Sequence, residues 1–539
     1  MERSASGPTW AIATPHEEAT RAGADAFERG GNAVDAALRA ATVLAVAYPH
    51  MCGVGGDLFA LVQRPDGETL AVSSSGRSPA AADPSAIRSP DHAMPIRGPA
   101  PVTVPGAAAG WRALHGTGAV LPWPDAFPRA IELAIDGVPV ARSLAETLAA
   151  PDEPFGADPG LSAIFFADGI PSPTGSTVRQ AALGATLTAI AHDGPEALYG
   201  GAIGTAYVDG LNAAGSSIAI EDLAAHRALV LPPLGAAFRD LHVSVVPPNS
   251  QGFVLLEILA LLERLGLDAD PHGPEAGAIA LVFASAARDR DRHLADPDHM
   301  TAHPSTLLDD GHLASLADEI RLERPAPLGS RSSGDTIALV AADSEGFAVS
   351  LIQSLFWGFG SGICEPATGI VAQNRGACFT LEPRHPNVFA PGKLPAHTLM
   401  PVLVHDERGV AAVAGSMGGY AQPQINAQTL LHLLGGAALD PRAARAGLAG
   451  ADRHRRERPG AGSAVPRIAA VPGCGGPRSL RRARACPSNP GASRWVRCGR
   501  RPSVGWGLPG RLTDYAVLVV APRARPLSDF GWRRCRIPR

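Results

Sequence analysis

The chain has 539 residues, of which 45% are hydrophobic and 18% are charged, with a net charge of -4. This apolar content is enough for one large globular core or two ordinary ones, so the composition excludes a chain that is disordered throughout. Glycine (60) and proline (50) make up about a fifth of the residues, which is below the range of low-complexity sequences and typical of many tight turns.

The first half of the chain is dominated by helical patterns. Residues 17–29 and 32–48 are rich in alanine and show apolar spacings near 3.6, which predicts two packed helices separated by Gly30 and Gly31. A glycine turn, GVGGD at 53–57, then leads into the apolar run LFALVQ and predicts a hairpin; without the Lys-Ser/Thr of a P-loop, it is not a phosphate loop. Further helices are expected at 127–136, 144–150, 178–192, 203–214 and 251–266.

Strand patterns become frequent later in the chain. Strands are expected at 241–246, 337–342, 346–352, 369–373, 400–404 and 411–414. The alternation of helix-rich and strand-rich blocks favours a fold of layered helices and sheets.

Residues 444–539 form a tail of a different kind. They hold 21 arginines against four acidic residues, a net charge of +17, and show no regular apolar period before YAVLVVA at 515–521. A basic arm for nucleic acid is one interpretation, but no folded nucleic-acid module or stacking aromatic pattern accompanies the charge. We prefer a shifted reading frame or a disordered segment, because arginine, glycine, proline, alanine and cysteine codons dominate the alternative frames of GC-rich coding sequence.

The cysteines and the first residues bear on the cellular compartment. The first twenty residues contain no apolar run of seven or more after a basic start, which predicts a cytoplasmic protein, and no apolar stretch is long enough for a membrane span. Cys52, Cys364 and Cys378 show no paired spacing and are expected to be reduced and buried. The other four cysteines lie too far apart for C-x-x-C halves, so no structural metal and no cofactor are predicted. These are Cys474, Cys486, Cys498 and Cys535.

Residues 332–428 concentrate strands, glycine turns and small polar side chains, in SSGDTIALVAADSEGFAVSLIQSLFWGFGSGI and the segments after it. Spacing alone does not separate Thr336 from a threonine with a structural role at the start of a strand. The chain nevertheless resembles the γ-glutamyltranspeptidases from about residue 8 to residue 443. The resemblance is carried by motifs in the family's order: FERGGNAVDAA, YPHMCGVGGD, VPGAAAGW at 104–111, ALYGG at 197–201, EDLAAHRA at 221–228, PPNSQG, SGDT, FGSG, GKxP and GG.

This resemblance implies an α/β fold of the N-terminal nucleophile hydrolases, a four-layer αββα sandwich of two stacked, mostly antiparallel sheets. It also implies a proenzyme that cuts itself between Asp335 and Thr336. Residues 1–335 then form the large subunit, residues 336–443 form the small-subunit region, and a homodimer of such heterodimers stays open. The freed α-amine of Thr336 would act as the general base for its own hydroxyl.

Further site residues follow from the resemblance. Gly418 and Gly419 match the oxyanion-hole glycines, whose N–H groups can approach a substrate closely. Arg77 matches an arginine that holds the substrate carboxylate. The remaining matches are Ser354, at the place of a threonine that supports the nucleophile, Asn374 on the substrate side, and His397 and Thr398 at the places of paired serines.

The departures from the family pattern concern substrate recognition. Cys378 stands before Phe379 where the family has the acid that grips the glutamyl ammonium group, and a thiol cannot pair with an ammonium in that way. Phe356 replaces an expected asparagine, and Arg375 adds a cation near the pocket. These changes favour an acidic acyl group without the amine. The QNRG and HT forms at 373–376 and 397–398 resemble the branch that includes oxamate amidohydrolase and cephalosporin acylase-like proteins.

Three hypotheses therefore stay open. The first is an amidohydrolase that acts on a small carboxylate-bearing amide, with water as the acyl acceptor and no nucleic-acid or membrane partner. The second is a glutathione hydrolase or γ-glutamyl transferase with altered contacts. The third is an inactive chain, because the tail stands where the family has its final strands and helices, and the loss of these strands would expose sheet edges.

Overall fold

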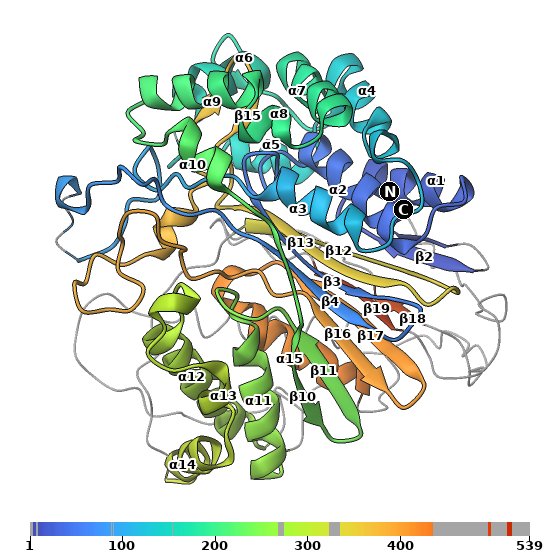
Figure 1. Ribbon diagram of the computed structural model, residues 1–539, viewed down its shortest axis with the longest axis vertical. Helices are drawn as coiled ribbons and strands as arrows, with labels where there is room; N and C mark the ends of the chain where they lie inside the picture. Colours follow the sequence, from blue (N-terminus) through green and yellow to red (C-terminus); the bar gives the residue numbers. More distant parts are fainter. Residues whose placement is uncertain are drawn as a thin grey trace, which may run out of the picture.

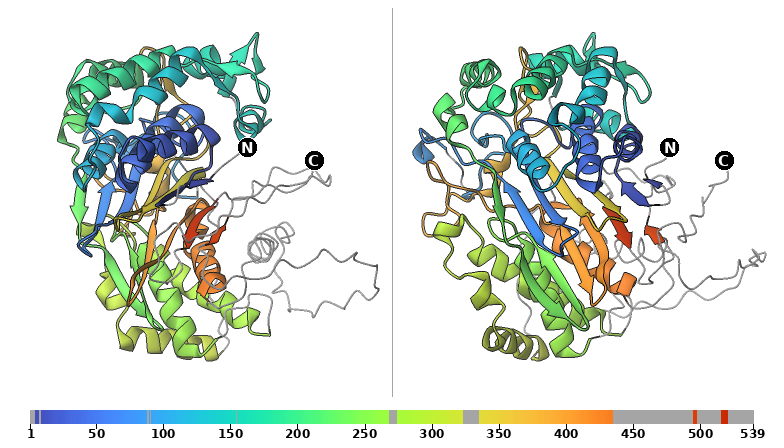
Figure 2. Two further views of the ribbon diagram at one scale, coloured as in Figure 1. Left: turned by 90° about the vertical axis from the view of Figure 1, so that its right-hand side faces the viewer. Right: turned by 45° about the vertical axis from the view of Figure 1, so that its right-hand side comes forward.

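The computed structural model describes residues 4–6, 9–87, 89, 91–153, 155–267, 274–322, 335–434, 494–496 and 515–519. Two antiparallel sheets are stacked face to face, with helices on the outer face of each (Figures 1 and 2). The expected four-layer αββα sandwich is confirmed.

The first sheet is built from both ends of the family-like region. Its strand order is β1-β2-β12-β13-β3-β4-β9, so the strands that follow residue 334 lie between strands from the first 75 residues. β3 and β13 are buried over their whole lengths, as their apolar composition predicts. The bounds are β1 Ser4–Ser6, β2 Trp10–Ala13, β12 Asp335–Asp343, β13 Ala348–Phe356, β3 Asp57–Gln63, β4 Thr69–Ser74 and β9 Leu229–Leu231.

The second sheet has the order β10-β11-β16-β17-β19-β18. The apolar run noted at 515–521 supplies β19, which pairs antiparallel with β17 from Ala412 to Ser416. The edge of β17 is therefore covered by a strand from the tail. The bounds are β10 Leu234–Phe238, β11 Leu241–Val245, β16 Val402–Asp406, β17 Gly409–Ser416, β19 Tyr515–Val519 and β18 Arg494–Val496.

Side-chain alternation along β12 shows how one strand serves two cores. Ile337, Leu339 and Ala341 lie in the core beneath the first helical layer, whereas Ala338 and Val340 lie in the core between the sheets. Successive side chains of a strand point to opposite faces of its sheet, so an apolar residue at every position is what a central strand of a sandwich needs.

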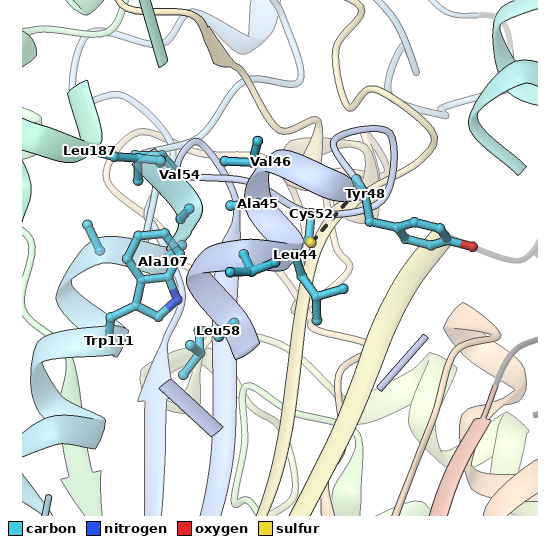
Figure 3. Close-up of a cluster of buried hydrophobic side chains, with 14 of the residues drawn as sticks. Leu44, Ala45, Val46, Tyr48, Cys52, Val54, Leu58, Ala107, Trp111 and Leu187 are labelled. Atoms are coloured by element: carbon cyan, nitrogen blue, oxygen red, sulfur yellow. Dashed lines mark hydrogen bonds between the residues drawn. The ribbon is translucent and has the colours of Figure 1, made fainter. Parts of the chain in front are cut away.

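The first helical layer packs on the first sheet through α1 (Glu17–Glu28), α2 (Ala33–Ala47) and α3 (Ala107–Gly116). α2 is buried at every residue, and its small alanine side chains let it lie close to the strands. Figure 3 shows Trp111 of α3 beside Leu58 of β3. The indole of Trp111 donates to the side-chain carbonyl of Gln353 (3.1 Å), and the Gln353 amide donates to the carbonyl of Ala41 (2.9 Å). These bonds fix β13 next to Ser354.

Smaller helices and two-residue strands complete this side of the molecule (Figure 1). The helices are α4 Pro128–Asp136, α5 Arg142–Leu148, α6 Pro159–Phe165, α7 Ala181–Asp193, α8 Glu196–Tyr199, α9 Ala202–Ala213 and α10 Ile220–Ala225. The strands are β5 Val138–Pro139, β6 Phe166–Ala167, β7 Ile170–Pro171, β8 Thr177–Val178, β14 Cys364–Glu365 and β15 Ile370–Val371.

The second helical layer covers the outer face of the second sheet. α11 lies against α12, α14 and α15 and contributes an apolar face that includes Phe253, Leu256 and Leu259. The bounds are α11 Gly252–Leu265, α12 Ala276–His293, α13 Pro304–Leu307, α14 Asp310–Arg321 and α15 Gln422–Leu434.

The structure confirms the expected burial of Cys52, Cys364 and Cys378, which are free thiols. Burial raises the pKa of the Cys52 thiol to about 12, so this thiol stays neutral at ordinary pH. The four other cysteines lie outside the described residues. Among the described helices, none combines the length and the apolar character that crossing a bilayer requires.

Candidate active site

Thr336 lies at an irregularity at the start of β12. Asp335 pairs with Phe356 and Ile337 pairs with Gln353, so the register between β12 and β13 shifts at Thr336. Phe356 has a φ of 80°, a left-handed conformation that an aromatic residue rarely adopts. Bulges and strained backbone of this kind are frequent beside functional sites, where they aim a side chain.

Ser354 joins the Thr336 hydroxyl to the peptide bond that precedes it. The Ser354 Oγ donates to the carbonyl oxygen of Asp335 (2.7 Å) and lies 3.1 Å from the Thr336 Oγ1. The backbone N–H of Phe356 donates to the same Ser354 Oγ (2.8 Å). Because the single hydroxyl proton of Ser354 is directed at Asp335, the Thr336 hydroxyl is the donor in its bond to Ser354. Thr336 and Ser354 are both buried.

The loop after β13 is fixed by two polar side chains. The N–H of Gly358 donates to the carboxylate of Asp335 (2.9 Å). The N–H of Trp357 donates to the Asn374 side-chain oxygen (3.2 Å), and the Asn374 amide donates to the carbonyl of Ile96 (2.7 Å). Asn374 therefore holds the loop beside the Asp335–Thr336 bond.

Arg375 is a fully buried cation whose hydrogen-bonding capacity is only partly used. Its guanidinium lies over the ring of Phe356, 4.3 Å from the centroid, and its Nη1 donates to the Thr398 Oγ1 (3.0 Å) and to the Cys378 Sγ (3.7 Å). The Nε and Nη2 groups have no hydrogen-bond partner within the described part of the chain. Buried N–H groups without partners are costly, so the site has unused donors for an anionic group.

Asp57 is the nearest described carboxylate to this cation, with its Oδ2 4.0 Å from the Arg375 Nε. Its Oδ1 accepts from the Gly76 N–H (3.1 Å) and from the Gln373 amide (2.9 Å). Burial raises the pKa of Asp57 to about 7, although Arg375 and these hydrogen bonds favour the ionised form. Asp57 therefore changes between its neutral and its ionised form near neutral pH.

His397 connects Asp57 to the loop before β16. Its Nδ1 accepts from the Leu399 N–H (3.3 Å), which leaves the Nε2 as the donor to the Asp57 Oδ2 (3.0 Å). Burial, together with the charge of Arg375, holds the pKa of His397 well below its usual value. The ring is thus a neutral donor that packs against Phe59, with 4.5 Å between the ring centroids.

Gly418 and Gly419 form the turn after β17. Their φ angles of 135° and 54° lie in the region that glycine adopts most readily. The Gln251 amide donates both to the Gly419 carbonyl (2.9 Å) and to the Thr398 carbonyl (2.8 Å). The ring of the following residue, Tyr420, makes an edge contact with Phe356.

Arg77 lies apart from these contacts. Its Nη1 donates to the buried Asp296 carboxylate (2.9 Å) and to the Gly392 carbonyl (2.9 Å), and its side chain is half exposed. Its backbone follows Gly76, which bonds to Asp57, so only the main chain of this loop reaches the Arg375 cluster.

The structure thus brings eight of the nine expected site residues into one set of linked contacts. A path of contacts runs from Thr336 through Ser354 and Phe356 to Arg375, and from Thr398 through Gln251 to Gly419. Asp57, Gln373 and Gln251 also belong to this set of contacts and were not expected from the sequence. The available signal for Asp57 was an acid that begins an otherwise apolar, buried strand directly after a glycine turn.

The four-layer sandwich of two stacked antiparallel sheets is the fold of the N-terminal nucleophile hydrolases. Solved structures agree: cephalosporin acylase from Bacillus halodurans aligns with a TM-score of 0.73 and 30% identity over 82% of this chain and 83% of the acylase. The γ-glutamyltranspeptidase of Helicobacter pylori aligns with a TM-score of 0.53 and 25% identity over 59% of this chain and 92% of that one.

Sequence comparisons specify the family. The family model described as Gamma-glutamyltranspeptidase matches residues 19–445, so the chain belongs to the γ-glutamyltranspeptidase family. It is 38% identical to the oxamate amidohydrolase proenzyme of Klebsiella pneumoniae over 77% of this chain and 79% of that protein. It is also 30% identical to the glutathione hydrolase proenzyme of Escherichia coli over 76% and 75% of the two chains. The chain is therefore an enzyme of the γ-glutamyltranspeptidase family.

Proposed function

We propose that this chain is a proenzyme that cleaves itself before Thr336 and then hydrolyses a small amide bearing a carboxylate next to the scissile bond. The observation that carries the proposal is the Ser354 hydroxyl, which touches both the Thr336 hydroxyl and the Asp335 carbonyl. The buried, half-satisfied guanidinium of Arg375 supports the choice of substrate.

Self-cleavage begins when the Thr336 Oγ1 attacks the carbonyl carbon of Asp335. The Ser354 hydroxyl donates to the carbonyl oxygen as that oxygen becomes negatively charged, and it accepts the hydrogen bond from the Thr336 hydroxyl. The C–N bond then breaks, the nitrogen takes up a proton, and an ester joins Asp335 to the Thr336 oxygen. Breaking the C–N bond has already freed the Thr336 amine, and water then hydrolyses the ester to an Asp335 α-carboxylate and the Thr336 hydroxyl.

The two products have a physical reason to stay together. β12 and β13 lie between β2 and β3, so the large and small subunits remain hydrogen-bonded within one sheet after the cut. The large and small subunits of the precursor are thus each other's partners.

Amide hydrolysis uses the Thr336 hydroxyl a second time, as the nucleophile toward the substrate. The α-amine of Thr336, with a reference pKa of about 7.7–8.0, takes the hydroxyl proton while the oxygen attacks the substrate carbonyl. The N–H groups at Gly418 and Gly419 receive the developing oxyanion. Ammonia or an amine leaves, and water releases the acid from the acyl-threonine ester.

Substrate selection is assigned to the Arg375 cluster. A carboxylate fits the unpaired Nε and Nη2 groups, because a guanidinium binds a carboxylate through two parallel hydrogen bonds. His397 and Thr398 hold the cluster together, and Asn374 positions the loop beside it. Arg77 contributes to binding if a substrate carboxylate replaces Asp296 as its partner.

Glutathione hydrolysis is the second candidate, favoured by the glutathione hydrolase relative. It requires recognition of a glutamyl ammonium group. Cys378, whose Sγ accepts from the Arg375 Nη1 (3.7 Å), stands where the family carries an acid. The Arg375 guanidinium beside Cys378 repels an ammonium group, so the amidohydrolase is preferred.

The proposal is tested by comparing two substrates on the purified protein. Ammonia release from oxamate and glutamate release from glutathione are measured in parallel, with Thr336→Ala as the matched inactive control. The proposal expects oxamate hydrolysis with the higher kcat/KM. A higher value for glutathione would support the second candidate, and activity that persists in the control would remove Thr336 as the nucleophile.

A further inference from the structure

Three helices of the second helical layer bring together two carboxylates and an imidazole. Glu257 lies on α11, Asp289 on α12 and His312 at the start of α14, and one potential ligand atom from each lies within 4.8 Å of the others. The expectation of no structural metal rested on cysteine spacing and did not test carboxylates. Residues so far apart in the sequence give no local motif.

Glu257 is the unusual member of this cluster. Its side chain is fully buried, and neither of its carboxylate oxygens has a hydrogen-bond partner within the described residues. Burial, with the charge of Asp289 beside it, raises the pKa of Glu257 well above its usual value. A buried carboxyl without a partner is costly, and a bound cation would remove that cost.

Asp289 and His312 supply the other two potential ligands of the cluster. The His312 Nε2 lies 2.6 Å from the Asp289 Oδ2, and Asp289 is buried whereas the His312 side chain is 28% exposed. His312 therefore gives the cluster a route to solvent for an ion and a water molecule. Arg288 on α12, whose charge acts on Glu257, is already paired with Glu319 (2.8 Å).

We propose that Glu257, Asp289 and His312 bind one zinc ion, with water in the fourth position. An imidazole with two carboxylates suits zinc better than magnesium or calcium, which prefer oxygen ligands alone. Zinc–ligand distances of about 2.0–2.2 Å place tetrahedral ligand atoms roughly 3.5 Å apart. Zinc binding therefore requires separations of up to 4.8 Å to shorten and the 2.6 Å between the His312 Nε2 and the Asp289 Oδ2 to lengthen, as zinc replaces their hydrogen bond. Bound zinc neutralises both buried carboxylates.

The position of the site assigns it a structural role. It joins α11, α12 and α14, which also meet through apolar contacts and through the Arg288–Glu319 and Arg264–Asp310 ion pairs. Next to Asp289 on α12, Arg290 donates to the carbonyl of Tyr420 (2.7 Å), the residue that follows the Gly418–Gly419 turn. Zinc therefore stiffens the helical layer behind that turn, and this inference does not depend on the proposed hydrolase activity.

The test is zinc binding by isothermal titration calorimetry on the chelator-treated full chain. Glu257→Gln keeps the size of the side chain and removes the charge, and His312→Asn removes the imidazole. We expect the affinity of one zinc ion to fall at least about tenfold in either variant and the melting temperature of wild type alone to rise with zinc. Asp318→Asn, an exposed acid on α14, is the matched control and should bind as wild type does.

Cobalt substitution distinguishes the proposed site from zinc held by cysteines elsewhere in the chain. A thiolate ligand gives cobalt a charge-transfer band that oxygen and nitrogen ligands do not give. Wild-type zinc affinity in folded Glu257→Gln and His312→Asn would overturn the proposal. So would an absence of zinc binding by wild type, or binding that produces only thiolate bands. Circular dichroism verifies that each variant is folded, and the zinc affinity of either folded variant is sufficient to test the proposal.

Discussion

Two buried polar clusters lie on opposite sides of the second sheet, and each lacks a different kind of hydrogen-bond partner. The Arg375 cluster, between the sheets and the loops beside Thr336, has guanidinium N–H groups without acceptors. The Glu257 cluster, within the second helical layer, has carboxylate oxygens without donors. A buried polar group without a hydrogen-bond partner in the protein indicates the charge of the ligand that would bind there. The first cluster is completed by an anion and the second by a cation.

This difference predicts that each cluster can be altered without harming the other. The Thr336 network and the Glu257 cluster share no described residue, and Arg290 beside Asp289 is the closest described link between them. Variants at the first site should change cleavage and substrate kinetics while zinc affinity stays constant. A variant that changes both the substrate kinetics and the zinc affinity would show that the two clusters are not independent.

The largest effect is expected from Thr336→Ala. Without the hydroxyl there is no attack on the Asp335 carbonyl, so self-cleavage and amide hydrolysis should both be abolished. A denaturing gel checks the first and ammonia release the second. Zinc binding should be unchanged, since Thr336 does not contact the helical layer; fragments from this variant would mean that another group cuts the chain.

Ser354→Ala should have the next largest effect. It removes the donor to the Asp335 carbonyl and the partner of the Thr336 hydroxyl, so the rate of self-cleavage should fall by roughly 100-fold to 1,000-fold. A time course of fragment appearance measures this rate. Ser354→Thr keeps the hydroxyl and should retain most of it; equal rates in Ser354→Ala and wild type would leave Ser354 with a structural role only.

Arg375→Met should lower kcat/KM for a carboxylate-bearing amide by roughly 100-fold, from about 3 kcal/mol of lost charge-assisted hydrogen bonding. Steady-state kinetics on cleaved protein measure the loss. A neutral amide of the same size is the control, because it cannot use the guanidinium. A uniform loss on both substrates would indicate that Arg375 maintains structure instead of selecting the anion.

The smallest effect concerns pH. Below a pH of about 7 Asp57 is protonated and the charge of Arg375 is uncompensated, whereas above it the ionised Asp57 competes with the substrate carboxylate. KM for the anionic amide should therefore rise a few-fold as the pH increases through about 7. Asp57→Asn, if its melting curve shows a folded protein, should flatten the profile; a flat wild-type profile would contradict the titration of Asp57 in this range.

Sequence patterns predicted much of the fold where one face or one run was strongly apolar. The helices at 17–29 and 32–48, the strand after GVGGD and the two strands that follow residue 335 are all present. α12 was missed because its last turns are dense in Arg and Asp, so no continuous apolar stripe marks it. α14 was also missed, because its apolar stripe of Leu313, Leu316, Ala317 and Ile320 covers only about two turns.

The candidate site was predictable only in part, for a physical reason. Thr336, Ser354 and the glycines lie in motifs that read along the chain. Asp57 and Arg375 meet only because β3 and the segment after β15 converge in space, and Arg77, expected beside the substrate, turns instead to Asp296. Contacts between residues more than 200 positions apart leave no local pattern.

The most direct test of the account is the intact mass of the purified wild-type protein, with sequencing of any fragment's N-terminus. The account predicts two fragments of 335 and 204 residues, the second beginning at Thr336. A single chain of 539 residues that stays uncut during prolonged incubation, while its circular dichroism shows a folded protein, would contradict it.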